Sequence, residues 1–331
     1  MKGLVLSCHA CSNPCARALA IVLLVAGCSG PEALYRSKPG AFPVRTVEDL
    51  LLHDEVQRRS MKVRLHYPDG LGPFPLIVYS HGAFCSPAMY DLVTRHWASH
   101  GYVVALPHHL DSLDNPERMA PDQLARLLAS RVRDLSFLLD ARADLQLAAD
   151  RPMRIDPERA AVSGHSFGGM IAMIKSGLSL KDGQYDLPGS SADPRFDAAV
   201  IMSGVGPMPQ MTEDAYAGLA GPLLASGGTL DEGNIGTGEI FPWEWRMSPF
   251  TLAPAGDKYS LVLEDGDHYL GGLICREDRG GNPDPEGVTI VRAVSTIFLD
   301  AYVRGDQAAR RYLQTTNIGG VTKGRARFAS K

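Results

Sequence analysis

One stretch, residues 160–174, constrains the fold of this chain more than any other. It reads Ala-Ala-Val-Ser-Gly-His-Ser-Phe-Gly-Gly-Met-Ile-Ala-Met-Ile, an apolar run that is interrupted by a serine between glycines and then resumes. The pattern predicts a strand, a sharp turn and a helix, because Gly164 and Gly168 match the G-x-S-x-G motif, in which glycines let the two arms of a strained turn pass closely. Such a turn exposes the hydroxyl of Ser166 as a nucleophile. It also places the amide of Phe167 at a helix N-terminus, where free N–H groups favour a developing oxyanion.

The chain on both sides of this stretch alternates short apolar runs with helical segments, which predicts βαβ units, an α/β fold and a mostly parallel central sheet. Two early strands, residues 47–53 and 61–67, are expected to form an antiparallel edge. The basic tail, residues 323–327, is expected to be a solvated terminus. The helix over residues 121–150 has a leucine stripe, with Arg126, Arg133, Asp134 and Arg142 opposite it. Further strands are expected at residues 74–80, 101–107, 196–203, 222–226 and 258–263, and further helices at 90–100, 288–303 and 307–314.

The N-terminus has the features of an export signal. Lys2 and Arg17 precede the apolar run at residues 18–26, which is shorter than the roughly 20 apolar residues that span a bilayer. Residues 25–28, Val-Ala-Gly-Cys, resemble the lipobox of bacterial lipoproteins, which implies cleavage before Cys28 and acylation of its thiol. Ser29 then implies the outer membrane. We expect a signal peptide (1–27), a lipidated, flexible tether (28–45), a catalytic domain (46–331) and an envelope location; an ordinary signal peptide is the alternative.

The composition argues against nucleic acid as a partner and leaves two cysteines that could form a disulfide. The chain has 33 basic and 37 acidic residues, a formal charge of −4, so its surface gives nucleic acid no electrostatic reason to bind. With the signal removed and Cys28 acylated, Cys85 and Cys275 remain. Each follows a loop at the expected rim of the site, so a Cys85–Cys275 disulfide is predicted, with two unpaired thiols as the alternative.

A serine hydroxyl needs a base and a carboxylate that orients that base, and the expected chain order is Ser, then Asp or Glu, then His. Asp231 follows the strand at 222–226, and His268 follows the strand at 258–263. Both therefore fall at the carboxyl ends of strands, where open α/β sheets keep their sites. The alternatives are a turn aspartate and a solvated loop histidine. We expect no metal site and no cofactor, since HExxH is absent and Cys-x-x-Cys occurs only before the cleavage point.

The loop after the strand at 74–80 is expected to supply the second oxyanion donor, the backbone amide of Ala83, beside that of Phe167. His165, inside the turn, is expected to have a packing role. His81, Trp243 and Trp245 are candidates for the substrate pocket. The two tryptophans belong to a long loop that is either an apolar wall for the substrate or is held in place by its own aromatic cluster.

Three stretches carry a resemblance to a known family: residues 80–83 (Ser-His-Gly-Ala), 98–104 (Ala-Ser-His-Gly-Tyr-Val-Val) and 161–169. Residues 74–268 resemble the α/β-hydrolase superfamily and, within it, platelet-activating-factor acetylhydrolases and their dienelactone-hydrolase-like and polyester-hydrolase relatives. The resemblance implies cofactor-free hydrolysis of short-acyl or compact esters. In the acetylhydrolase branch, the catalytic acid lies at the place that residues 201–204 occupy here. These residues read Ile-Met-Ser-Gly and include no carboxylate. The resemblance therefore favours Asp231, which lies at the position used by the polyester-hydrolase branch. Dienelactone hydrolases use a cysteine where Ser166 stands.

These observations predict a lipid-anchored serine esterase that acts on a small-molecule ester through Ser166, His268 and Asp231. Two alternatives stay open. An amidase or peptide hydrolase uses the same residues, and a non-catalytic envelope lipoprotein would have kept the fold for binding. The oligomeric state does not follow from the sequence.

Overall fold

The protein is described by a computed structural model over residues 34–116, 118–120, 123–181, 187, 191–234, 238–278 and 281–331. The predicted signal peptide and Cys28 lie outside these residues, so both remain predictions. Among the described residues, no helix combines the length and the apolar character needed to cross a membrane.

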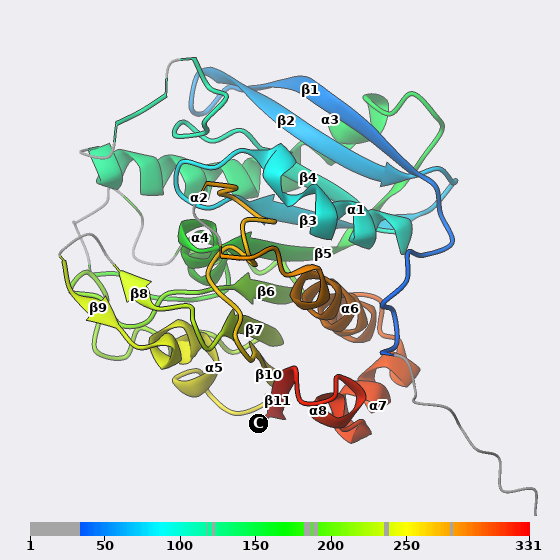
Figure 1. The fold of residues 1–331 in the computed structure, drawn as a ribbon. Coiled ribbons are helices and arrows are strands. Elements are labelled where there is room, and N and C mark those ends of the chain that lie inside the picture. The colour runs from blue at the N-terminus through cyan, green and yellow to red at the C-terminus, as the bar shows by residue number, and fades with distance from the viewer. Residues whose placement is uncertain are drawn as a thin grey trace, which may run out of the picture. The chain divides into compact units, whose positions relative to one another are not determined.

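A nine-stranded sheet forms the centre of the fold, in the order β1-β2-β4-β3-β5-β6-β7-β10-β11 (Figure 1). The strands from β4 to β10 in this order are parallel, whereas β1, β2 and β11 pair antiparallel at the two edges. A short hairpin, β8–β9, stands apart from this sheet. The strands are β1 Val44–Asp54, β2 Arg59–Pro68, β3 Phe74–Ser80, β4 Val103–Pro107, β5 Ile155–His165, β6 Ala198–Met202, β7 Leu223–Gly228, β8 Gly233–Asn234, β9 Ile240–Phe241, β10 Lys258–Leu263 and β11 Ala326–Ser330.

Helices cover both faces of the sheet, which explains why the central strands are apolar along their whole length. All seven residues of β3 are buried. Leu76 and Val78 belong to one core cluster and Ile77 and Tyr79 to the other, because successive side chains of a strand point to opposite faces. Helices α2 (Leu124–Asp140), α3 (Arg142–Leu147) and α4 (Phe167–Lys175) pack in the first cluster, and α1 (Asp91–Ser99), α6 (Pro285–Tyr302) and α7 (Gln307–Thr315) in the second. Shorter helices are α5 (Ser248–Thr251), α8 (Ile318–Val321) and the 3₁₀ segments Pro87–Tyr90 and Trp243–Met247.

This architecture confirms the predicted α/β-hydrolase fold class, with its mostly parallel sheet and antiparallel N-terminal edge. The expectation for the basic tail was wrong. Residues 326–330 form β11, in which Ala326 is buried and the Phe328 ring stacks on Tyr259 at 5.7 Å. The charge of Arg327 lies outward, against Glu264 and the Trp243 ring, a common way to protect an edge strand from further pairing.

The described residues before β1, which were expected to belong to the tether, are bonded to the body of the protein. His96 Nε2 donates to the carbonyl oxygen of Arg36 at 2.9 Å, and His100 Nε2 donates to that of Lys38 at 3.1 Å. The Arg36 guanidinium also forms an ion pair with Asp300 of α6 at 2.7 Å. Residues 36–38 therefore follow a fixed path across α1 and α6.

Candidate functional site

The turn between β5 and α4 has the strained geometry that its sequence predicts. Ser166 has φ 56° and ψ −118°, a left-handed conformation that L-residues rarely adopt. Its amide donates to the carbonyl oxygen of Met202 at the end of β6 (2.9 Å), and its carbonyl accepts the first helical bond from Met170 (3.0 Å). These backbone bonds hold the strained residue in place. The side chain of Ser166 stands between the strand and the helix and is partly exposed.

The two glycines of the motif are needed because backbone segments pass close to them. A Cβ atom on Gly164 would overlap the carbonyl of Gly168, and a Cβ atom on Gly168 would overlap the carbonyl oxygen of Ser80 at the end of β3. The end of β5 is thus packed against the start of α4, and the start of α4 is packed against the loop that begins after β3. A larger side chain at either position would displace one of these segments.

Asp231 and His268 come from neighbouring loops that are bonded to each other. Thr229 donates to the carbonyl of Leu263 at 2.9 Å, and Leu230 donates to that of Gly266 at 3.0 Å. These bonds bring the loop after β7 against the loop after β10. His268 Nδ1 consequently donates to Asp231 Oδ1 over 2.7 Å.

The carboxylate of Asp231 is fully buried and has a second hydrogen-bond partner, an arginine, that the sequence analysis missed. Arg246, from the 3₁₀ segment Trp243–Met247, donates through Nε to Asp231 Oδ1 at 3.1 Å. Its other nitrogens donate to the carbonyls of Gly204 (3.3 Å) and Glu232 (3.1 Å). Burial alone would raise the pKa of Asp231, but the contacts with His268 and Arg246 outweigh it and lower the pKa to about 2. Asp231 is therefore ionised at neutral pH.

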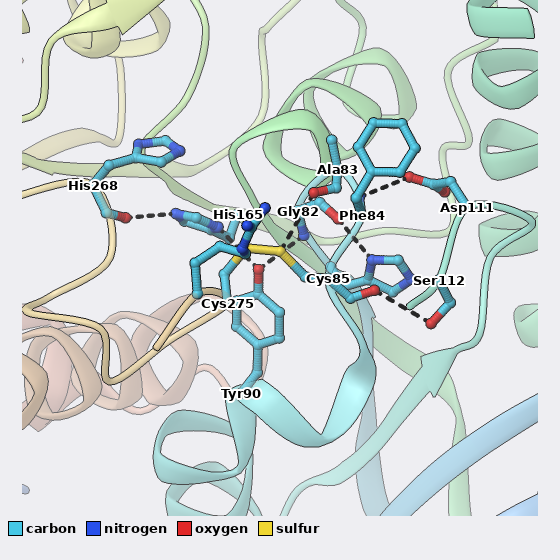
Figure 2. The surroundings of a disulfide bond; sticks show 12 residues. Gly82, Ala83, Phe84, Cys85, Tyr90, Asp111, Ser112, His165, His268 and Cys275 are labelled. Carbon is cyan, nitrogen blue, oxygen red and sulfur yellow. Dashed lines mark hydrogen bonds between the residues drawn. A yellow bond between two sulfur atoms is a disulfide. The ribbon is translucent and has the colours of Figure 1, made fainter. Parts of the chain in front are cut away.

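His165 connects the histidine loop to the loop after β3 (Figure 2). Its Nε2 lies 2.9 Å from the carbonyl oxygen of His268 and must donate there, so its Nδ1 accepts from the Tyr90 hydroxyl at 3.0 Å. The Tyr90 oxygen in turn accepts from the amide of Gly82 at 2.9 Å. The rings of His165 and His268 are 4.6 Å apart, which places His268 beside the Ser166 turn. Burial, followed by the nearby His268, keeps the pKa of His165 well below its usual value, as this packing role requires.

The two predicted oxyanion donors lie on the segments that meet at this turn. Phe167 is the first residue of α4, and Ala83 is an exposed residue of the loop after β3. Among the described residues, neither backbone amide has a hydrogen-bond partner. An unpaired amide at an exposed or partly exposed position is what an incoming oxyanion requires.

The predicted disulfide is present. Cys85 and Cys275 are bonded, with Cα atoms 5.2 Å apart, across 190 residues of sequence. Cys85 ends the loop that carries Ala83, and Cys275 follows His268 in its loop (Figure 2). The bond therefore links the two loops covalently.

The three pocket candidates differ in exposure. His81 is buried, and its Nδ1 lies 2.7 Å from the carbonyl oxygen of Gly82. Trp245 is also buried, stacks on Phe241 at 5.0 Å and donates its indole N–H to the carbonyl of Pro207, which corresponds to the aromatic-cluster alternative for this loop. Trp243 is partly exposed beneath the Arg327 guanidinium.

A groove of about 790 Å³ lies next to the loop that carries Ala83. Its lining does not include Ser166 or His268. The lining includes Cys275 of the disulfide and Phe84, the neighbour of Cys85. The other lining residues are Met89, Leu113, Arg118, Met119, Ala120, Arg276, Glu277 and Asp278. Among the described residues, no group of three or more His, Cys, Asp or Glu side chains has the arrangement of a metal site.

Comparison with known proteins gives one family match. Residues 38–194 match the chlorophyllase family model, which belongs to the α/β-hydrolase superfamily. The match covers slightly less than half of the chain; it includes Ala83 and Ser166 but ends before Asp231 and His268. No curated protein matches the chain. Together with the fold, the match points to hydrolysis of a carboxylic ester, while the resemblances to acetylhydrolases and polyester hydrolases remain predictions.

Proposed function

We propose that this protein is a serine esterase that hydrolyses short-acyl or compact carboxylic esters through a covalent acyl-enzyme. One observation carries the proposal: the strained Ser166 turn adjoins a histidine whose Nδ1 donates to a buried, ionised aspartate over 2.7 Å. A serine in a sharp turn has its hydroxyl presented to the substrate, and a histidine oriented by a carboxylate is the base that this hydroxyl lacks.

In the proposed reaction, Ser166 Oγ attacks the ester carbonyl while His268 Nε2 takes its proton. The carbonyl oxygen becomes an oxyanion, which accepts hydrogen bonds from the amides of Ala83 and Phe167. When the C–O bond breaks, His268 returns the proton to the leaving alcohol, and the acyl group stays on Ser166. Water then attacks the acyl-enzyme with His268 again as base, which releases the carboxylic acid and restores the serine. Asp231 keeps Nδ1 protonated and stabilises the imidazolium throughout.

The proposal is tested with nitrophenyl esters of increasing acyl length. Wild-type protein should hydrolyse the acetyl and butyryl esters, and Ser166→Ala should lose nearly all of this activity. Ser163→Ala is the matched control, because Ser163 lies on β5, three residues before Ser166, and donates its hydroxyl to the carbonyl of Val200 at 2.8 Å. It should retain activity. Equal rates for wild type and Ser166→Ala would refute the proposal.

The two alternative functions give different results in the same assay. Faster cleavage of nitroanilides than of the matching esters would favour an amidase. A folded wild-type protein that cleaves neither substrate would favour a non-catalytic binding protein.

For the location of the protein, we propose acylation at Cys28 and an anchor in the bacterial outer membrane, supported by the lipobox-like sequence Val-Ala-Gly-Cys and by Ser29. The intact mass of the mature protein should show cleavage before Cys28 and an added diacylglycerol and fatty acid. Cys28→Ala should shift the protein from the membrane fraction to the soluble fraction. Unmodified mature protein beginning elsewhere would contradict the anchor.

A further inference from the structure

The loop that carries Ala83 is held on both sides of that residue by one buried ion pair. Arg131, in the middle of α2, donates to the carbonyl of His81 at 2.5 Å and to the carbonyl of Gly82 at 3.2 Å. On the other side, Phe84 donates its amide to Asp111 Oδ2 at 3.1 Å, as Figure 2 shows. The amide of Ala83 lies between these bonds and has no hydrogen-bond partner among the described residues.

Arg131 and Asp111 are both fully buried and are bonded to each other by more than one contact. Arg131 Nη2 lies 2.7 Å from Asp111 Oδ2, and Nε lies 2.9 Å from Oδ1. Burial alone would raise the pKa of Asp111, but the charge and hydrogen bonds of Arg131 outweigh it and hold the pKa well below its usual range. Asp111 is therefore ionised at neutral pH, and the two-point contact fixes its geometry against the guanidinium.

The same guanidinium also reaches the residue that supplies the other oxyanion donor. The carbon at the centre of the Arg131 guanidinium lies 4.7 Å from the centre of the Phe167 ring, within the range of a cation–π contact. Arg131 thus touches the carbonyls that precede Ala83 and the side chain of Phe167. One side chain contacts the segments that carry both amides.

We propose that Arg131 and Asp111 are positioning residues for the oxyanion hole. The pair fixes the peptide groups around Ala83 so that its amide stays unpaired and at a fixed separation from the amide of Phe167. This inference rests on the proposed esterase function. Net stability is a poor reason for a charge pair at this place, because a buried ion pair contributes little more than apolar side chains of the same volume.

The test compares Arg131→Met and Asp111→Asn with a matched control, Asp300→Asn. Asp300 is also a buried aspartate paired with an arginine, at 2.7 Å from Arg36, but its partners Arg36, Arg304 and Tyr102 lie outside the candidate site. For each variant we would measure kcat and KM with a nitrophenyl ester and the free energy of unfolding in urea. The affinity for a trifluoromethyl ketone, which adds to the serine and places an oxyanion in the hole, provides a readout that a purely structural role would not change.

Loss of one oxyanion donor lowers kcat by about 10²- to 10³-fold, so we expect a loss of about this size in Arg131→Met and a smaller one in Asp111→Asn. KM should change little, and the affinity for the ketone should fall in parallel with kcat/KM. Asp300→Asn should lose stability but keep kcat. If Arg131→Met does not fold, Asp111→Asn, which preserves the size of the side chain, supplies the result.

Two different failures are distinguishable. A wild-type protein that neither hydrolyses esters nor binds the ketone overturns the proposed function, and this inference with it. An active wild type whose Arg131 and Asp111 variants keep kcat and ketone affinity to the same extent as Asp300→Asn overturns only the positioning role.

Discussion

Replacing Asp231 with asparagine affects both its proposed catalytic role and its structural one. In wild type, Asp231 accepts hydrogen bonds from both His268 (2.7 Å) and Arg246 (3.1 Å) and has no exposed side-chain surface. In Asp231→Asn, the amide can no longer hold His268 in the required tautomer, and the Arg246 guanidinium loses its charge partner. Both effects follow from the same substitution, so the single variant alone cannot separate them.

The expected magnitudes differ between the two effects. Loss of the orienting carboxylate in a serine–histidine–aspartate site lowers kcat by about 10⁴-fold, which corresponds to about 5.5 kcal/mol of transition-state stabilisation. Leaving a buried charge without its partner costs about 3–5 kcal/mol of folding stability. We expect a value near the lower limit here, because asparagine keeps an oxygen acceptor for Arg246. The Gly204 and Glu232 carbonyls also remain bonded to Arg246.

The double variant Asp231→Asn/Arg246→Met then distinguishes the roles. It removes the unpaired charge, so most of the lost unfolding free energy should return, while kcat should stay about 10⁴-fold below wild type. Urea unfolding gives the first quantity and nitrophenyl ester hydrolysis the second. A single variant that retains kcat within about tenfold of wild type would refute the role of Asp231 as the orienting acid. A double variant no more stable than the single one would refute the contribution of the Arg246 pair.

Three further predictions follow from the same geometry. Gly168→Ala should abolish most ester hydrolysis, because its Cβ atom would overlap the Ser80 carbonyl and displace the loop that carries Ala83; full activity in the purified variant would contradict this. Cys275→Ala should lower the free energy of unfolding, measured in urea, by up to about 5 kcal/mol, since the disulfide closes a loop of 190 residues; an unchanged urea midpoint would argue against the bond. Asp231 and Asp91 have pKa values of about 2 in the folded protein, below the usual 3.8, so their stabilising contribution is complete above about pH 4 and is lost as the pH falls towards 2. Circular dichroism during acid titration should therefore show stability decreasing through that window, and a protein equally stable at pH 2 and pH 6 would contradict the assignment.

Much of the fold could be predicted from the sequence because the apolar runs of the central strands are also the segments that the sheet buries. The strands at residues 74–80 and 258–263 are found with those limits, since uninterrupted apolar runs bounded by turn residues have few alternatives. The tail was misjudged because its basic residues suggested solvation. Around the start of β11, however, Arg325 and Arg327 alternate with Ala326 and Phe328, and this period-two pattern was the available signal for a strand.

The sequence predicted the order of the candidate site residues along the chain, but not the buried side chains that contact them. Asp134 was placed opposite the leucine stripe of its helix, yet it is fully buried and accepts from His109 Nδ1 at 2.7 Å. Arg131 lies three residues after Leu128 and four before Leu135, so it occupies a position of the apolar stripe. A charged residue at such a position signals a buried partner, but the identity of that partner depends on tertiary contacts. Arg246 gave no comparable signal, because it lies in a long loop without periodicity.

The most direct test of the central claim is reaction of the purified mature protein with a fluorophosphonate, followed by mass spectrometry to locate the adduct. A fluorophosphonate modifies a serine only where a base has activated it, so we expect a single adduct at Ser166 that is lost in His268→Ala. Labelling of Ser166 at an equal rate in His268→Ala would contradict the role of His268 as the base. A folded wild-type protein that is not labelled would contradict the catalytic account as a whole.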